Sequence, residues 1–203
     1  EAHYFRTADY ILYNPNVLTA DDPAGPYPSH DYWDLGESSA GHNHWAVYQE
    51  FTDIATGAKF LFVCFHLQVP NNDDQIRENQ TNSMLDQASA LGRSLGVPIV
   101  YAGDTNSAVE TSHAFDGPRL AMQARNVVDA FDVAASRSNT KYDSANNFSR
   151  VPPAHAKYID GFFLSPGVAA LSWKLLLDLS GGRFVGTIAS DHNPLLVDVV
   201  IPY

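Results

Sequence analysis

Clusters of polar and charged side chains stand at the ends of strand-like apolar runs, and this placement constrains the fold more than any other feature of the chain. The run Pro98–Ala102 leads directly into Gly103–Ser107, which carries an aspartate and an asparagine. Near the C-terminus, Ser190–Pro194, with an aspartate and a histidine, leads into the apolar run Leu195–Ile201. Carboxylates and imidazoles at strand ends are what a metal-assisted phosphoester site requires. We therefore expect a sheet-containing fold that gathers these side chains.

The composition describes an acidic, cysteine-poor globular chain. It has 203 residues, 12 basic and 23 acidic side chains, a formal net charge of −11 and one cysteine, Cys64. This length suits one domain with a real core, taken as residues 1–203. The negative charge repels polyanions, so charge-driven tracking along DNA is not expected. One cysteine excludes an internal disulfide, and no apolar run could span a bilayer. A secreted bacterial and a cytoplasmic location both stay open.

Hydrophobic periodicity predicts strands, hairpins and one long helix. Trp45–Thr52 alternates and Lys59–Leu67 is nearly continuous, so these runs predict a hairpin around the turn Asp53–Gly57. An amphipathic pattern that stops at Gly96 predicts a helix over about Gln75–Leu95. The other expected elements are strands at Tyr10–Tyr13, Val97–Ala102, Tyr158–Leu164, Ala169–Leu177 and Leu195–Ile201, helices at Leu120–Val128 and Val127–Ala135, a turn at Gly181–Gly182, and a long loop forming a rim or flap at Thr19–Gly41. This order favours an α+β fold.

Four polar segments follow one another in the order of a known superfamily. They are Phe65–Gln68, Gly103–Asn106, Tyr158–Ser165 and Ser190–Pro194, with the long helix between the first two. Each alone is weak, because Asp-x-Asn and Asp-His also occur in ordinary turns. Together they resemble the endonuclease/exonuclease/phosphatase superfamily, whose signatures are a histidine after an apolar strand, Gly-Asp-x-Asn, Ile-Asp before apolar residues, and Ser-Asp-His-x-Pro. The resemblance covers the chain from about Tyr10 onward. It implies a two-sheet β-sandwich flanked by helices and metal-dependent hydrolysis of a phosphoester.

The resemblance also implies a role for each matching side chain. Asp104 would orient or deprotonate the attacking water, and Asn106 would hold a phosphate oxygen. Asp160 would fix the ring of His192 against the phosphoryl group, because a carboxylate partner raises imidazole basicity and selects the tautomer. His66 would be a second imidazole, donating to a non-bridging oxygen as negative charge builds. Asp160 is hard to explain otherwise, since an acid inside an apolar strand is costly without a partner.

A divalent cation, Mg²⁺ or Mn²⁺, is implied as the cofactor. Asp191 would be its ligand, because hard cations prefer carboxylate oxygens. Gln68 and His155 are further candidates for contact with substrate, the first at the mouth of the site and the second in the loop before the Ile-Asp strand. His42 and His44 have the alternate spacing of a metal clip, but we expect them on the rim.

The chain departs from the superfamily pattern at its beginning. Complete members start with a strand carrying an asparagine and a helix ending in Gln-Glu, whose glutamate is the principal metal ligand. Glu50 follows a glutamine, but it lies in the predicted hairpin only 16 positions before His66, so we reject it as that ligand. We therefore expect a partial domain that lacks the first strands. An N-terminal segment of the same domain is the expected partner of this chain.

Several functions stay open on the sequence alone. The leading one is hydrolysis of a phosphodiester, with nucleic acid or a phospholipid head group as the candidate substrates, and a phosphomonoester is a third option. A nuclease favours a basic surface, a phospholipid diesterase an exposed apolar hairpin, and a phosphomonoesterase a narrow cationic pocket. The alternative from another class is a non-catalytic binding module that kept the fold after losing its metal glutamate.

Overall fold

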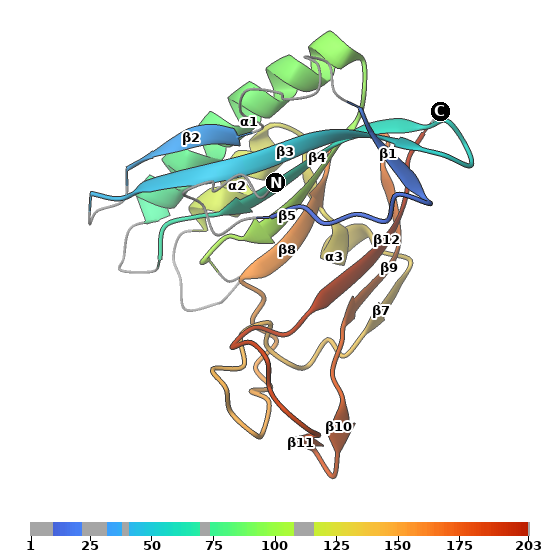
Figure 1. The fold of residues 1–203 in the computed structure, drawn as a ribbon. Coiled ribbons are helices and arrows are strands. Elements are labelled where there is room, and N and C mark those ends of the chain that lie inside the picture. Colours follow the sequence, from blue (N-terminus) through green and yellow to red (C-terminus); the bar gives the residue numbers. More distant parts are fainter. Residues whose placement is uncertain (1–9, 22–31, 38–40, 70–73, 108–115, 203) are drawn as a thin grey trace, which may run out of the picture.

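Two β-sheets pack face to face, and helices cover the outer face of the larger one (Figure 1). The computed structural model describes residues 10–21, 32–37, 41–69, 74–107 and 116–202 of the chain. The α+β two-sheet sandwich that the sequence predicts is confirmed. No helix within the described ranges is both long and apolar enough to cross a membrane.

The larger sheet has seven strands of mixed direction. They are β1 (Leu18–Asp21), β2 (Tyr32–Glu37), β3 (Asn43–Asp53), β4 (Lys59–His66), β5 (Ile99–Asp104), β6 (Val128–Asp129) and β8 (Asp160–Leu164). Their order is β1-β3-β4-β5-β8-β6, with β2 also pairing with β3. β4 and β5 are parallel because helix α1 (Asp74–Leu95) connects them as a crossover, whereas β5 and β8 are antiparallel.

The smaller sheet has three strands and faces the larger one. Its order is β12-β9-β7, where β7 is Ser136–Ser138, β9 is Ala169–Leu175 and β12 is Leu195–Val200. A separate two-stranded hairpin joins β10 (Leu179–Ser180) to β11 (Arg183–Phe184). Its turn is the predicted Gly181–Gly182, where both glycines have positive φ, 58° and 77°.

Strand β4 shows how side-chain alternation divides the core into two layers. Leu61, Val63 and Phe65 belong to the cluster under helix α1, and Phe60 and Phe62 pack against the cluster between the two sheets. The larger sheet is therefore apolar on both faces, which explains why the sequence of β4 reads as a nearly continuous apolar run.

Helix α1 confirms the long helix that the sequence predicts. Met84, Leu85 and Ala88 lie on its buried face. Asp74 is an acidic residue in its first turn, where its negative charge interacts favourably with the helix dipole. The helix ends before Gly96, whose φ of 72° is a conformation that glycine adopts without strain. The β3–β4 hairpin is confirmed as well.

Two expectations for the N-terminal part are wrong. Tyr10–Tyr13 has no regular secondary structure, and Leu12 is 94% exposed, so this apolar run is not drawn into a sheet. Thr19–Gly41 is not only a loop, because most of β1 and all of β2 fall within it. Trp33 of β2 stacks on Tyr48 of β3 with ring centroids 4.1 Å apart, a cross-strand contact that favours pairing of a strand containing Gly and Asp. Residues 22–31 and 38–40 of this stretch lie outside the described residues.

The two short helices begin at residues other than those that the spacing of apolar residues predicted. Helix α2 (Gly117–Ala124) begins before the predicted Leu120 because the Asp116 side chain caps it and Pro118 suits its first turn. The predicted Val127–Ala135 helix is shorter, since β6 takes the first residues and only α3 (Ala130–Val133) is helical.

At Gly103 the backbone of β5 lies too close to β4 for a side chain. A Cβ atom built on Gly103 would lie 2.0 Å from the carbonyl oxygen of Phe65. Only glycine fits there, because the obstacle is backbone and cannot rotate away. The close approach holds the ends of β4 and β5 together, next to the polar residues that follow.

Replacement of Gly103 should therefore lower the stability of the fold far more than replacement of a glycine in a helix. We expect Gly103→Ala to lower the free energy of unfolding by at least about 2 kcal/mol, measured by urea denaturation. The matched control is Gly92→Ala in α1, where an added Cβ would lie 2.8 Å from the end of the Ile99 side chain and 3.3 Å from the nearest backbone atom, the Val97 carbonyl oxygen. Helix propensity offsets that contact, so the control should stay within about 1 kcal/mol of wild type. Equal stability of the two variants would contradict the close approach.

Candidate active site

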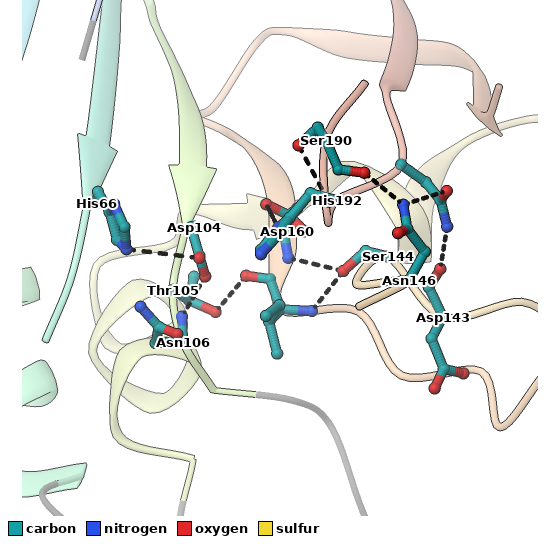
Figure 2. A network of polar contacts seen from close by, with 12 residues as sticks. His66, Asp104, Thr105, Asn106, Asp143, Ser144, Asn146, Asp160, Ser190 and His192 are labelled. Atoms are coloured by element: carbon teal, nitrogen blue, oxygen red, sulfur yellow. Dashed lines mark hydrogen bonds and ion pairs between the residues drawn. The ribbon is translucent and has the colours of Figure 1, made fainter. Parts of the chain in front are cut away.

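Three neighbouring strands bring one ionisable residue each to the same edge of the larger sheet. His66 ends β4, Asp104 ends β5 and Asp160 begins β8. The register pairs His66 with Asp104, and Asp104 with Asp160. Cross-strand partners share a face of the sheet, so the three side chains form a row (Figure 2). Alternation along β5 places this row on the face toward the smaller sheet, since Tyr101 faces the helices.

His192 completes the group from the segment that precedes β12. Its Nδ1 donates to both carboxylate oxygens of Asp160, at 2.8 and 3.0 Å, so Nε2 points away from this partner (Figure 2). The hydrogen bond to Asp160 raises the pKa of His192 to about 9, against an opposing effect of burial. The imidazole is therefore cationic at neutral pH. Ligand atoms of Asp104, Asp160 and His192 all lie within 4.8 Å of one another.

Asp104 occupies a crowded and poorly solvated position. Burial and the charge of Asp160 raise the pKa of Asp104 to about 6, although the backbone N–H of Asn106 donates to its Oδ1 at 2.7 Å. His66 Nε2 lies 3.6 Å from Asp104 Oδ2, close enough for an ion pair when the imidazole is protonated. The pKa of Asp104 thus lies between that of an ordinary aspartate and that of a base suited to neutral pH.

A buried polar network that the sequence did not indicate supports this group. The hydroxyl of Ser144 accepts the backbone N–H of Ile159, at 3.0 Å, and of Asp160, at 3.2 Å. The Thr105 hydroxyl donates to the Ile159 carbonyl at 2.8 Å, so two separate loops hold the start of β8 (Figure 2). Ser144 lies in a loop without periodicity, and only the concentration of polar residues in Asp143–Asn147 could have drawn attention to it.

The same loop holds the segment that carries His192. The side-chain amide of Asn146 donates to the Ser190 carbonyl and to the Asn193 side chain, at 3.1 and 3.0 Å. Asn193 in turn donates to the Asp143 carbonyl at 2.8 Å. Because Asp143, Asn146 and Asn193 are buried, these bonds are shielded from water and fix the backbone on either side of His192.

The other predicted site residues are placed differently. Asn106 has a positive φ of 49°, and its amide donates to the Leu67 carbonyl at 3.0 Å, so it also fixes the turn after β5. Asp191 is exposed beside His192, outside the group of close ligand atoms. Gln68 is only 4% exposed, and its backbone N–H donates to the side-chain oxygen of Gln80 in α1 at 2.9 Å, so it does not line an open mouth.

Three further residues clarify the limits of the site. His155 is paired with Asp143, with Nδ1 3.0 Å from Oδ2, and no contact joins it to the Asp104 group among the described residues. Glu50 lies opposite Leu61 in the β3–β4 ladder, five positions before the His66 end, in agreement with its rejection as a ligand. His44 donates from Nδ1 to the His66 carbonyl at 2.9 Å, so it holds the end of β4 from the rim.

A cleft of about 270 Å³ opens beside the row of ionisable residues. Polar side chains from the row meet an apolar floor in it. The lining residues are Cys64, Phe65, His66, Gly103, Asp104, Asp160, Gly161, Phe162, Asn193 and Leu195. The cleft contains two carboxylates and the His66 imidazole, and the His192 imidazole is bonded to Asp160 of its lining. Such groups can exchange protons with a bound ester and neutralise its negative charge.

Comparisons with known proteins identify the fold. Solved structures similar to this chain include a mannosyl-6-phosphatase from Bacteroides thetaiotaomicron, with 18% sequence identity and a TM-score of 0.72, covering 93% of this chain and 69% of that one. An endonuclease/exonuclease/phosphatase from Bacteroides vulgatus has 22% identity and a TM-score of 0.69, covering 94% and 69%. D. rerio TDP2, complexed with a single-stranded DNA product, has 17% identity and a TM-score of 0.57, covering 92% and 70%.

These likenesses confirm the resemblance at the level of the fold. The chain has the endonuclease/exonuclease/phosphatase fold and spans about two thirds of the length of these solved chains. No family model and no curated protein sequence matches it.

Removing the charge of Asp104 should stabilise the metal-free protein. Its pKa is raised to about 6 in the folded state, above the roughly 3.9 of an unfolded chain, so folding loses stability as pH rises between these values. Asp104→Asn keeps an oxygen for the Asn106 N–H and abolishes the repulsion from Asp160. We expect a gain of about 1 to 2 kcal/mol in unfolding free energy at pH 7, measured by urea denaturation with a chelator. The gain should disappear below pH 4, and a loss of stability at pH 7 would contradict the crowding of the carboxylates.

The His192–Asp160 pair should make the protein less stable as pH rises into the alkaline range. The pKa of His192 is raised from about 6.5 in an unfolded chain to about 9 in the folded one, so its contribution is complete below pH 6.5 and lost as pH rises through 9. In metal-free protein we expect the free energy of unfolding to fall between pH 6.5 and 9. The free energy of unfolding of His192→Gln should fall less over this pH range. Identical slopes for the two proteins would show that the ion pair does not form in solution.

Proposed function

We propose that this chain is a divalent-metal-dependent phosphoesterase, most suited to a phosphodiester, in which water attacks phosphorus next to Asp104. The observation that carries the proposal is the row of His66, Asp104 and Asp160 with His192 bound to its end. The shared fold adds support, because the proteins compared include a phosphatase and a protein complexed with a DNA product.

Asp104 is the proposed base. The attacking water gives its proton to the Asp104 carboxylate as the new P–O bond forms and the bond to the leaving alkoxide breaks, and the alkoxide takes up a proton from solvent. A pKa of about 6 for Asp104 suits this task, because the group is ionised at neutral pH yet more basic than an ordinary aspartate. The Asn106 N–H holds Oδ1, so Oδ2, which lies 3.6 Å from His66 Nε2, is the oxygen that would accept the proton.

Two imidazoles are the proposed donors to the phosphoryl oxygens. His192 is cationic at neutral pH because its pKa is about 9, and its Nδ1 is held by Asp160, so Nε2–H is the atom that would meet the phosphate. His66, across the row, would donate to a second oxygen as negative charge develops. Preorganised donors of this kind act only when they are held in place, which the Ser144 and Thr105 contacts to the start of β8 achieve.

The side chains fit a hard divalent cation. Asp191 offers an exposed carboxylate next to His192, and the mutual repulsion of Asp104 and Asp160 marks an excess of negative charge that a cation would offset. A bound Mg²⁺ or Mn²⁺ supplies Lewis-acid polarisation of a phosphoryl oxygen. The association of this chain with an N-terminal segment of the same domain stays a prediction.

The nature of the ester is the least constrained part of the proposal. The net charge of −11 disfavours long polyanions, and the apolar floor of Phe162 and Leu195 favours an ester with an uncharged group beside the phosphate. A panel of single-stranded DNA, glycerophosphocholine and a sugar 6-phosphate separates a nuclease, a phospholipid-type diesterase and a phosphomonoesterase.

The proposal is tested by hydrolysis of bis(p-nitrophenyl) phosphate with Mg²⁺ or Mn²⁺. We expect Asp104→Ala to lower the rate at least about 100-fold, because it removes the base, and His192→Gln to lower it by a similar factor. A chelator should abolish the activity. Asp86→Asn is the matched control, since Asp86 is exposed on α1 and paired with Arg125.

Two results would decide against hydrolysis at this site. Full activity of a double Asp104→Ala, His192→Ala variant would place the chemistry elsewhere. A wild-type protein that binds phosphoesters with Mg²⁺ but cleaves none of the panel would favour the binding module on the same fold.

A further inference from the structure

An exposed aromatic residue adopts an unfavourable backbone conformation in the loop that is bonded to the His192 segment. Asn147 and Phe148 are consecutive residues with positive φ, 52° and 55°. Asparagine tolerates this region, but a bulky residue there is uncommon and costs free energy that glycine would not. The ring does not compensate by burial, because Phe148 is 61% exposed. Packing and local conformation therefore both disfavour a phenylalanine at this position.

Hydrogen bonds fix the turn that carries Phe148. The backbone N–H groups of Asn146 and Asn147 both donate to the Asp191 carbonyl, at 2.6 and 3.0 Å. The N–H of Phe148 donates to the Asn146 side chain at 2.8 Å. On the other side, the N–H of Phe184 in β11 donates to the Arg150 carbonyl at 2.9 Å. The ring is thus presented to solvent from a rigid frame.

That frame is continuous with the catalytic group. Ala145 forms an isolated antiparallel bridge with His192, three residues before Phe148. Asp191, the proposed cation ligand, is the residue whose carbonyl the turn surrounds. The same network of Asn146, Ser190 and Asn193 therefore positions both the His192 imidazole and the backbone of Phe148.

We propose that Phe148 is a specificity-determining residue whose exposed ring stacks on a planar ring carried by the substrate phosphoester, a nucleobase being the common case. This inference rests on the proposed function and names the substrate class of that site. A rigid aromatic face loses little conformational freedom on binding, and one stacked base contributes a sequence-tolerant contact. A single stacking platform suits a mononucleotide ester or a strand end, in keeping with the acidic surface.

The test compares two esters that share one leaving group. Thymidine 5′-(p-nitrophenyl phosphate) carries a base, and methyl p-nitrophenyl phosphate does not. We expect Phe148→Gly to raise KM for the thymidine ester about 5- to 100-fold, the range for one lost base stack, and to leave the methyl ester unchanged. Phe148→Trp should keep the preference for the thymidine ester. Equal losses on both esters, or no loss on either, would overturn the proposal.

Stability measurements separate the platform from a structural role. Phe148→Gly removes the unfavourable side chain at positive φ, so its urea midpoint should equal or exceed that of wild type, whereas a packing role predicts a lower midpoint. Ala156→Gly is the matched control: Ala156 is exposed with φ 57°, so this variant should gain stability without any change in KM. If Phe148→Gly does not fold, Phe148→Asn also removes the aromatic ring, and asparagine tolerates a positive φ.

A binding measurement distinguishes failure of this proposal from failure of the proposed function. Calorimetric titration with thymidine 5′-monophosphate needs no turnover. Weaker binding by Phe148→Gly than by wild type would support the platform even if neither ester is cleaved. Equal affinity of the two proteins would overturn the platform even if both esters are cleaved.

Discussion

The pairing of β4, β5 and β8 is the constraint on which the rest of the site depends. It sets His66, Asp104 and Asp160 in a single row at one edge of the sheet. Burial of Asp104, together with the neighbouring charge of Asp160, raises the pKa of Asp104 to about 6. The arrangement stabilises a cationic His192 in return. The same arrangement of charged groups therefore makes the sheet edge electrostatically unfavourable and shifts the two pKa values toward those that acid–base chemistry needs.

That strain persists because the backbone around it is held firmly. Gly103 lets β4 and β5 approach each other, and the Ser144 hydroxyl and Thr105 side chain secure the start of β8. Buried amides of Asn146 and Asn193 do the same for the segment around His192. Such contacts cost flexibility but keep the imidazole and carboxylates from relaxing apart, which is the physical basis of preorganisation. The proposed function and the stability of the protein thus make opposite demands at Asp104, and the same network around it supports both.

The sequence predicted the regular elements where periodicity was strong and failed where pairing decided. Helix α1 and the β3–β4 hairpin follow from spacing of apolar residues. Tyr10–Tyr13 has a strand-like composition but no strand partner, and β2 forms despite a weak pattern because β3 offers an edge and Trp33 can stack on Tyr48. Ser144 and Asn146 could not be recognised, because a polar loop residue becomes a buried hydrogen-bond partner only when distant segments meet it.

By itself the sequence determined which groups are present and which strands carry them. The motifs containing Asp104, Asp160 and His192 indicated phosphoester chemistry only together and in order, since each alone also occurs in ordinary turns. Only the tertiary structure decided how these groups affect one another. Register sets the Asp104–Asp160 repulsion and the His192–Asp160 bond, and it leaves Asp191 exposed and Gln68 buried. The physical reason is that pKa and exposure depend on distances between segments far apart in the chain, which local sequence does not encode.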